Sequence, residues 1–335
     1  MYPLKLKPKF IEKVWGGRKL ETHLQKQIPN NRTIGESWEL YHIDGDSSQI
    51  ENGEWQGKHL HEIMQRFPQD ILGADHPADA FPLFIKFIDA DQALSVQVHP
   101  DDAHARLFGQ PNGKTESWLA LQGDPHGEII CGLRPGTDQQ ILERAIQKDR
   151  SADLLNRFPT RAGDVYMIKG GTVHAIGAGT LLLEIQQNSN VTFRIYDWGR
   201  LGLDGKPRPL HIREALQVVD YEITEAEFRP APQSFSHNGS AYSRLTDCDY
   251  FVIERFQVDS LLSMPRIRGK FEAIINLSHP CQLESPDNAF DPVELKTGEV
   301  ALLPASVRDY HISGKKCEII RTYVPKRRKG HGEGL

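Results

Sequence analysis

Cysteine is scarce in this chain, and its spacing excludes the usual cysteine-based sites. Among 335 residues there are four cysteines, at Cys131, Cys248, Cys281 and Cys317, and no two of them form a CxxC pair. Exported disulfide scaffolds and thiolate zinc sites need several cysteines at characteristic spacings. We therefore expect neither kind of site, and we expect a cytoplasmic location.

Long apolar runs and an excess of basic residues are also missing. The longest apolar stretches, such as GTLLLEI, are shorter than the roughly 18 residues that a membrane helix needs. Lysines interrupt the apolar residues of MYPLKLKPKF, so we expect no signal peptide. The net charge is 40 − 45 = −5, whereas nucleic-acid-binding domains are usually basic. We expect neither a membrane nor a nucleic acid as a partner.

Short β-rich segments dominate what is present. The hydrophobic fraction of 39% is enough for a core, and about 150 residues per domain gives roughly two domains. Many short strands between Gly, Pro, Asp and Asn turns are typical of a sandwich or barrel. The predicted strands are 82–88, 94–99, 164–168, 180–187, 191–196, 250–258, 271–277, 299–303 and 317–324.

Three segments have helical patterns. In 138–149 the apolar residues form one stripe, and 59–67 is similar and ends at Pro68. A short helix over 211–219 marks the end of the first domain.

Composition divides the chain further. The stretch 229–240 is rich in Pro, Ser, Gly and Asn, which predicts a linker. We therefore predict an N-terminal metal-binding domain over 1–228 and a C-terminal degenerate domain over 229–324. The basic tail 325–335 has almost no apolar content and is predicted to be disordered.

A weak internal repeat relates the two halves. GDVYMIKGGTVH at 163–174 resembles GEVALLPASVRD at 298–309, with His174 in the first copy where the second has Asp309. We infer a duplicated β-barrel in which the first copy alone kept a metal.

Two histidines and a carboxylate are candidate metal ligands. Alternation along a strand places His99 and Gln97 on one face, Glu116 lies in KTESW, and His174 lies in a glycine-rich turn. Each one separately is explained by a solvated face, a surface charge or a structural histidine. Together they form a ligand set that suits zinc and other borderline divalent ions, with Gln97 as a candidate fourth ligand.

Charged residues also occur in the middle of apolar strands. Glu184 and Arg194 each lie on one face of a strand whose other face is apolar. This pattern is consistent either with a buried ion pair or with a base and a cation beside the metal. Lys86 is costly inside its strand unless it meets an anion, and Lys114 shares a face with Glu116.

Several motifs together resemble type I mannose-6-phosphate isomerases of the short bacterial form. They run in family order from residue 13 to residue 200, and beyond residue 220 the resemblance is weak. The motifs are KVWGG, GESWEL, FPLFIKFIDA, LSVQVHPDD, KTESW, TVHAIG and LEIQQNSNVTFRIYDWGR.

The resemblance implies a fold and a metal site. The implied fold is mainly β, with two cupin-type (jelly-roll) β-barrels and a few short helices. The implied cofactor is one zinc ion, or another divalent metal, per chain. Its implied ligands are His99, Glu116 and His174, with Gln97 matching a further ligand of longer relatives.

The resemblance also implies roles for the strand cations and for Glu184. Arg194 matches the active-site arginine, Glu184 matches a carboxylate proposed as the base, and Lys114 and Lys86 match active-site lysines that bind substrate.

The implied activity is a metal-dependent isomerisation of an aldose to a ketose. Mannose 6-phosphate and fructose 6-phosphate would interconvert through a cis-enediol, with this sugar phosphate as the small-molecule partner of a monomer or weak homo-oligomer. A non-catalytic cupin-type sugar-binding or regulatory protein and a metal-using oxygenase are the alternatives. Glu184 and Arg194 beside the three ligand positions favour the isomerase.

Overall fold

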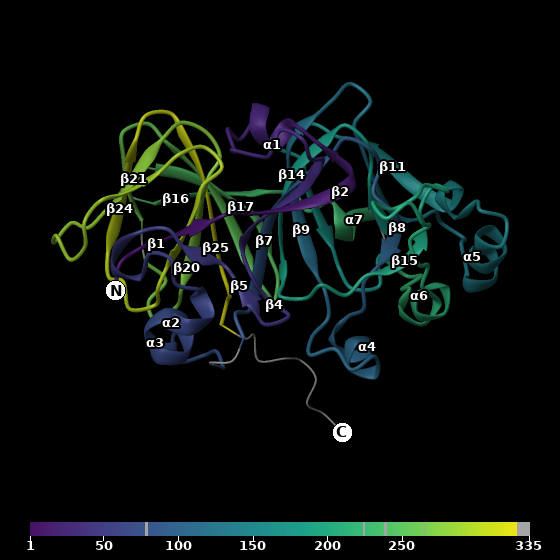
Figure 1. Ribbon diagram of the computed structural model, residues 1–335, viewed down its shortest axis with the longest axis horizontal. Helices are drawn as coiled ribbons and strands as arrows, with labels where there is room; N and C mark the ends of the chain where they lie inside the picture. The colour runs from purple at the N-terminus through teal and green to yellow at the C-terminus, as the bar shows by residue number, and fades with distance from the viewer. Residues whose placement is uncertain (78–79, 224, 238–239, 265, 327–335) are drawn as a thin grey trace. The chain divides into compact units, whose positions relative to one another are not determined.

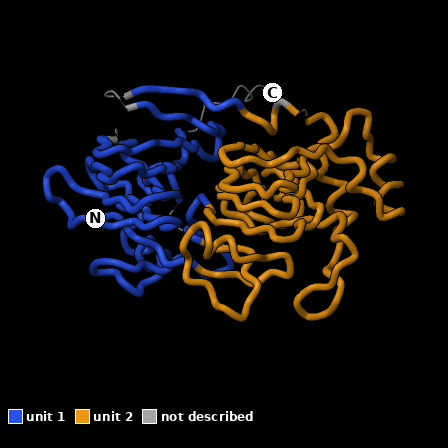
Figure 2. The backbone as a smooth tube through the Cα atoms, turned by 90° about the horizontal axis from the view of Figure 1, so that it is seen from above, with its two compact units in different colours: residues 1–8, 39–83, 231–335 blue, residues 9–38, 84–230 orange. Residues whose placement is uncertain are grey.

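The structure is a computed structural model, and its chain divides into two compact units (Figures 1 and 2). It describes residues 1–77, 80–223, 225–237, 240–264 and 266–326. Unit 1 contains residues 1–8, 39–83 and 231–335, and unit 2 contains residues 9–38 and 84–230. Each unit therefore combines segments that are far apart in sequence. The predicted domains 1–228 and 229–324 are a simpler division, and they stay a prediction.

Unit 2 is built from two antiparallel sheets. The six-stranded sheet has the order β12 (Val165–Ile168), β9 (Glu116–Gly123), β14 (Thr180–Gln187), β7 (Leu83–Ala90), β3 (Ile34–Leu40), β2 (Lys9–Gly17). At two strand ends, residues 39–40 of β3 and residue 83 of β7 are assigned to unit 1. The five-stranded sheet has the order β11 (Leu155–Pro159), β10 (Glu128–Leu133), β13 (His174–Ile176), β8 (Val96–Val98), β15 (Phe193–Tyr196). Its helices are α1 (Lys19–Thr22), α4 (Asp102–Leu107), α5 (Gln139–Ile146), α6 (Ile212–Val218) and α7 (Glu225–Phe228).

A shared core packs between these two sheets. Trp118 of β9 and Leu182 of β14 belong to the same buried cluster as Ile129 and Cys131 of β10. The other face of the five-stranded sheet packs against α6, because Ala215 of that helix lies in a second cluster with residues of β8 and β15 (Figure 1). Strand β10 is accordingly apolar on both sides, with Ile129 and Cys131 in the first cluster and Ile130 in the second.

Unit 1 also contains sheets around an apolar core. Its eight-stranded sheet has the order β16 (Gln233–His237), β17 (Ser240–Asp247), β18 (Val252–Val258), β25 (Cys317–Tyr323), β20 (Glu272–Asn276), β23 (Val300–Leu303), β1 (Leu4–Lys7), β6 (Gln49–Ile50). The four-stranded sheet is β19 (Leu261–Met264), β24 (Tyr310–Gly314), β21 (Cys281–Glu284), β22 (Val293–Leu295), and β4 (His42–Ile43) pairs with β5 (Asp46–Ser47). The helices are α2 (Leu60–Arg66) and α3 (Pro68–Leu72).

The mainly β architecture and the three predicted helices are confirmed. The segments 59–67, 138–149 and 211–219 contain α2, α5 and α6. None of the helices in the described part of the chain has the length and apolarity needed to cross a membrane.

The two copies of the sequence repeat have the same local structure. Gly163 and Gly298 both have a positive φ, of 93° and 76°, which glycine adopts without steric strain. Strands β12 and β23 each begin two residues after these glycines. The repeat therefore marks equivalent turn-and-strand segments in the two units.

The predicted linker is wrong over part of its length. Residues 233–237 form β16, which pairs with β17, and the ring of Phe235 stacks on that of Tyr242 at 5.4 Å. Cross-strand pairing outweighs the turn-rich composition here, because strand propensity depends strongly on neighbouring strands. Residues 327–335, most of the tail predicted to be disordered, lie outside the described residues.

Candidate metal and active site

The three predicted ligands meet inside unit 2. His99 follows β8, Glu116 begins β9 and His174 begins β13. One ligand atom from each lies within 4.8 Å of the others, and at most 1% of each residue is exposed. The Glu116 carboxylate lies between the two rings, with Oε2 at 3.6 Å from His99 Nε2 and Oε1 at 3.4 Å from His174 Nε2.

The chemistry of these side chains fits a divalent cation. The Nδ1–H of His174 donates a hydrogen bond to the carbonyl of Thr172 at 2.9 Å, so in the neutral ring Nε2 carries the lone pair that faces Glu116. Burial lowers the pKa of His174 to about 4, and burial followed by Lys114 lowers the pKa of His99. Both rings are thus neutral near pH 7, which is the form that binds metal. Two imidazole nitrogens and a carboxylate suit zinc-like ions.

Gln97 lies beside this cluster. It pairs across β8 and β13 with His174, and its Nε2 is 3.3 Å from His174 Nε2. Its Oε1 accepts a hydrogen bond from Ser95 Oγ at 3.2 Å. The amide is therefore next to the ligand atoms, and its role as a fourth ligand stays a prediction.

Lys114 points into the same cluster. Its Nζ lies 2.9 Å from Glu116 Oε2 and 3.0 Å from His99 Nε2, and 5% of the residue is exposed. Two residues that the sequence analysis missed hold the backbone on either side of it. Asp102 accepts a hydrogen bond from the N–H of Gly113 at 2.8 Å, and Gln187 accepts one from that of Thr115 at 2.8 Å. Gln187 also donates to Asp102 at 3.0 Å, so the two form one clamp.

Lys86 meets the anion that its position requires. Its Nζ lies 2.8 Å from Glu184 Oε1, and both side chains are buried. Burial lowers the pKa of Lys86, but Glu184 and Glu36 outweigh burial and leave the pKa above its ordinary value. Glu36, which the sequence analysis also missed, accepts a hydrogen bond from Trp38 Nε1 at 2.7 Å.

Arg194 and Glu184 lie on different sheets of unit 2. Glu184 is on β14 of the six-stranded sheet, and Arg194 is on β15 of the five-stranded sheet. The Nε of Arg194 donates to Ser95 Oγ at 3.3 Å, and its Nη1 donates to the carbonyl of Pro209 at 2.8 Å. Among the described residues, the ion pair of Glu184 is with Lys86, so the Glu184–Arg194 brace considered from sequence is not formed.

Two further arginines lie near Arg194. Arg200 and Arg208 both bond to Asp197, at 2.8 Å from Nη2 of Arg200 to Oδ1 and 2.7 Å from Nε of Arg208 to Oδ2. Burial, followed by the charge of Arg208, lowers the pKa of Arg194. Arg200 and Arg208 thus share the carboxylate of Asp197, while Arg194 bonds to Ser95 and Pro209. The positive charge of the three guanidinium groups exceeds the negative charge of this one carboxylate, which favours an anion. The motif YDWGR holds Arg200, but sequence alone did not show that Arg208 joins it.

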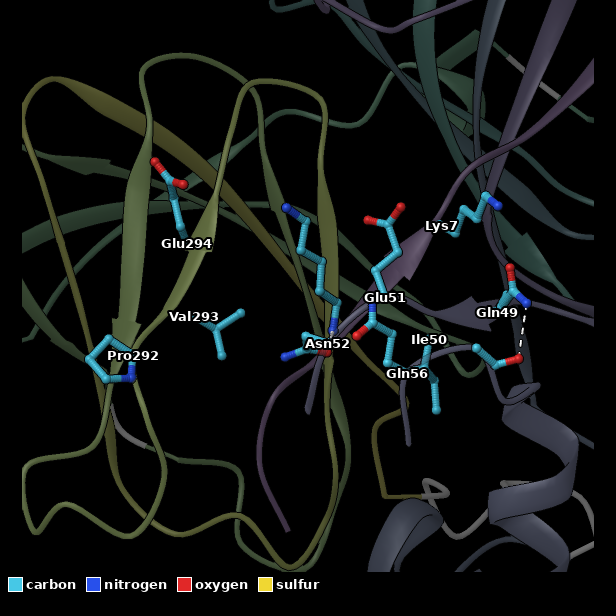
Figure 3. A pocket seen from close by; sticks show the side chains of 11 residues that line it. Lys7, Gln49, Ile50, Glu51, Asn52, Gln56, Pro292, Val293 and Glu294 are labelled. Atoms are coloured by element: carbon cyan, nitrogen blue, oxygen red, sulfur yellow. Dashed lines mark hydrogen bonds between the residues drawn. The ribbon is translucent and has the colours of Figure 1, made fainter. Parts of the chain in front are cut away.

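A separate cavity lies in unit 1 (Figure 3). It has a volume of about 510 Å³ and is lined by residues that include Lys5, Lys7, Asn52 and Glu294. All of the lining residues belong to unit 1, whereas every predicted site residue belongs to unit 2. None of the predicted site residues lines this cavity.

Comparison with known proteins points to one family. Residues 3–134 match the model of the phosphomannose isomerase type I catalytic domain. The chain is 32% identical to the mannose-6-phosphate isomerase ManA of Bacillus subtilis, over 93% of this chain and 96% of the relative. It is 29% identical to a mannose-6-phosphate isomerase of Streptococcus mutans, over 96% and 98% of the two chains. A crystal structure of mannose 6-phosphate isomerase from Bacillus subtilis matches with a TM-score of 0.88 at 30% identity, over 96% and 99%.

Proposed function

Because this chain belongs to the type I mannose-6-phosphate isomerase family, we propose that it interconverts mannose 6-phosphate and fructose 6-phosphate. The observation that carries this proposal is the buried cluster of His99, Glu116 and His174 with Lys114 at hydrogen-bond distance. A metal site, a buried carboxylate at Glu184 and a cation at Arg194 in the same unit supply the groups that an aldose-ketose isomerisation needs.

We propose that His99, Glu116 and His174 hold one zinc ion, or another divalent ion, per chain, with Gln97 as a candidate fourth ligand. Such an ion, when bound, polarises a carbonyl and can hold vicinal oxygens of a sugar. The neutral histidines and the buried carboxylate described above support this assignment.

The reaction itself moves one proton between neighbouring carbons. A base removes the proton from C2 of the open-chain aldose. The electron pair of that bond forms the C1–C2 double bond while the π pair of the C1 carbonyl moves to O1, which takes up a proton to give the cis-enediol. Loss of the proton on O2 then forms the C2 carbonyl, the electron pair of the C1–C2 double bond takes a proton at C1, and the ketose results. We propose Glu184 as this base. Burial, followed by the charge of Glu116, raises the pKa of Glu184, which makes a carboxylate a better proton acceptor.

The cations are proposed to bind substrate and stabilise charge. Lys114 and Lys86 are assigned to substrate binding, since both are buried ammonium groups beside the candidate ligands or base. Arg194 either stabilises the enediolate or binds the phosphate, and Arg200 and Arg208 add positive charge near it. Both roles use the planar donor geometry of a guanidinium group.

We further propose that the sheets of each unit correspond to the cupin-type barrels implied by the family. The equivalent β12 and β23 segments support this duplication. The cytoplasmic location, the monomeric or weakly oligomeric state and the lack of a nucleic-acid partner also stay predictions.

An assay of fructose 6-phosphate formation from mannose 6-phosphate tests the proposal. We expect turnover that a chelator abolishes and that added divalent metal restores. A metal-loaded protein that binds the sugar phosphate without turnover would support the non-catalytic alternative instead. Activity that requires oxygen would support the oxygenase.

A further inference from the structure

Trp118 lies between two parts of the proposed catalytic machinery. It is two residues after Glu116 on β9, and it pairs directly with Glu184 on the neighbouring strand β14. The strands run side by side in Figure 1. The indole is among the largest fully buried side chains, with 1% of the residue exposed. Such a side chain fills the core, but its polar atom also needs a partner.

That partner is Glu184. The Nε1–H of Trp118 donates to Oε2 of Glu184 at 2.9 Å, while Oε1 of the same carboxylate pairs with Lys86 at 2.8 Å. The ammonium of a lysine is a mobile point charge that does not fix the plane of a carboxylate. The terminal torsion of a glutamate is broad, so one contact leaves the carboxylate free to rotate. A second, rigid donor on the other oxygen removes that freedom.

The ring of Trp118 contacts the metal side of the site. It packs edge-on against the ring of His174, with 5.4 Å between centroids and 73° between planes. The Nδ1–H of His174 is in turn held by Thr172. One rigid side chain therefore touches both the proposed base and a proposed metal ligand. It is a donor only and is neutral, so it orients Glu184 without adding a charge.

We propose that Trp118 is a positioning residue, which fixes the plane of the Glu184 carboxylate relative to His174 and so aims the base at the reacting carbons. This inference rests on the proposed function. Phenylalanine at position 118 would keep an aromatic ring in the core but lose the N–H donor. The carboxylate would then keep its contact with Lys86 and lose its fixed orientation.

The variant Trp118→Phe tests this role against Trp198→Phe. Trp198 is a matched control in the same unit, because its Nε1 donates to a backbone carbonyl, that of Leu94, at 2.7 Å. In Trp118→Phe we expect kcat to fall about 10- to 100-fold with KM within about twofold, because a misplaced catalytic group slows chemistry more than binding. We expect metal content per chain to stay at the wild-type value. In Trp198→Phe we expect some loss of thermal stability with kcat within about twofold of wild type.

An independent readout follows the indole itself. The protein has five tryptophans, so a ¹H–¹⁵N spectrum should contain five indole N–H signals, and loss of one in Trp118→Phe identifies its source. We expect Glu184→Gln to move that signal strongly, because the carboxylate acceptor becomes a neutral amide. We expect the other four signals to move little.

The outcomes separate the two claims. A wild-type kcat in a folded Trp118→Phe protein overturns the positioning role. An indole N–H signal of Trp118 whose chemical shift is unchanged in Glu184→Gln also overturns it. Where Trp118→Phe does not fold, Trp118→Tyr, which also lacks the indole N–H, is measured by the same criteria. Absence of isomerase activity in the wild-type protein refutes the proposed function and the positioning role together. An active wild type with an unchanged kcat in Trp118→Phe refutes the positioning role alone.

Discussion

Nζ of Lys86 lies 2.8 Å from Oε1 of Glu184, with 8% and 3% of the two side chains exposed. Taking either charge out of water is costly, and the pair is tolerated because each charge compensates the other. Trp118 and Glu36 add further contacts or charge to the pair. The proposed base is thus tied to a cation that lies in the middle of β7.

Removing the cation should therefore destabilise unit 2. We expect Lys86→Met to lose about 3–5 kcal/mol in free energy of unfolding, because it leaves an uncompensated buried carboxylate. The double variant Lys86→Met with Glu184→Gln should recover part of this loss. Urea unfolding followed by circular dichroism measures both. As a control, Arg150→Met removes an exposed pair with Asp153 and should cost less than about 1 kcal/mol. Equal losses of unfolding free energy in Lys86→Met and Arg150→Met would contradict a buried ion pair between Lys86 and Glu184.

Metal content should depend on the two histidines. Purified protein should carry about one divalent ion per chain, and His99→Ala or His174→Ala should remove it together with most activity. Elemental analysis after gel filtration measures the content. His126→Ala, an exposed histidine of the same unit, should keep the ion. Full occupancy in both ligand variants would refute the assignment, and a second ion per chain would refute the inference that the repeat around Asp309 lost its metal.

The variant Arg194→Lys tests whether activity needs only a positive charge at position 194 or also the planar donor geometry of the guanidinium group. The guanidinium bonds in two directions, to Ser95 and to Pro209, which one ammonium group does not reproduce. We expect a folded, metal-loaded variant whose turnover falls roughly 100-fold, as for the loss of one well-placed electrostatic donor. Steady-state kinetics with thermal unfolding and metal analysis check this. Arg213→Lys, on the exposed side of α6, serves as the control. Near-normal turnover in Arg194→Lys would leave this arginine a structural role.

Acid stability should depend on Glu36. Burial raises the pKa of Glu36, but Lys86 and Lys13 outweigh burial and lower the pKa from 4.5 to about 2. A carboxyl whose pKa is lower in the folded than in the unfolded protein stabilises the fold above pH 4.5, and this contribution is lost as pH falls towards 2. We expect Glu36→Gln to be less stable than wild type at pH 6, with a difference that shrinks between pH 4.5 and 2. Urea unfolding across this range measures it. A difference independent of pH would refute the assigned titration.

Residue type and strand alternation were enough to predict much of this site. His99 ends a predicted strand, Glu116 lies in the polar segment KTESW and His174 lies in a glycine-rich turn between two predicted strands. Together they form a ligand set, and the structure brings them together. Lys86 stands out because an ammonium in an apolar strand needs an anion, and the structure supplies Glu184.

The partners that hold the site were harder to predict. Trp118 contacts Glu184 across 66 residues of sequence, and Gln187 contacts Asp102 across 85. Such contacts depend on which strands are neighbours and in what register, and neither is visible in a strand pattern. Tryptophan and glutamine in strands are also common enough in cores and on surfaces that their residue type carries little signal. The same dependence on neighbours explains why 233–237 forms a strand despite its turn-rich composition.

The pairing of β9 with β14 also limits how the length of this chain can vary. From Leu182 to Gln186 the two strands keep one register, and it shifts between Leu181 and Leu182. One residue inserted between Leu182 and Glu184 would exchange the two faces of the strand, so that an apolar side chain would take the place of Glu184 opposite Trp118. An insertion ahead of Leu181 falls where the ladder already accommodates an irregularity. Homologous chains should therefore differ in length ahead of the position of Leu181. They should keep the same number of residues between the positions of Leu182 and Gln186.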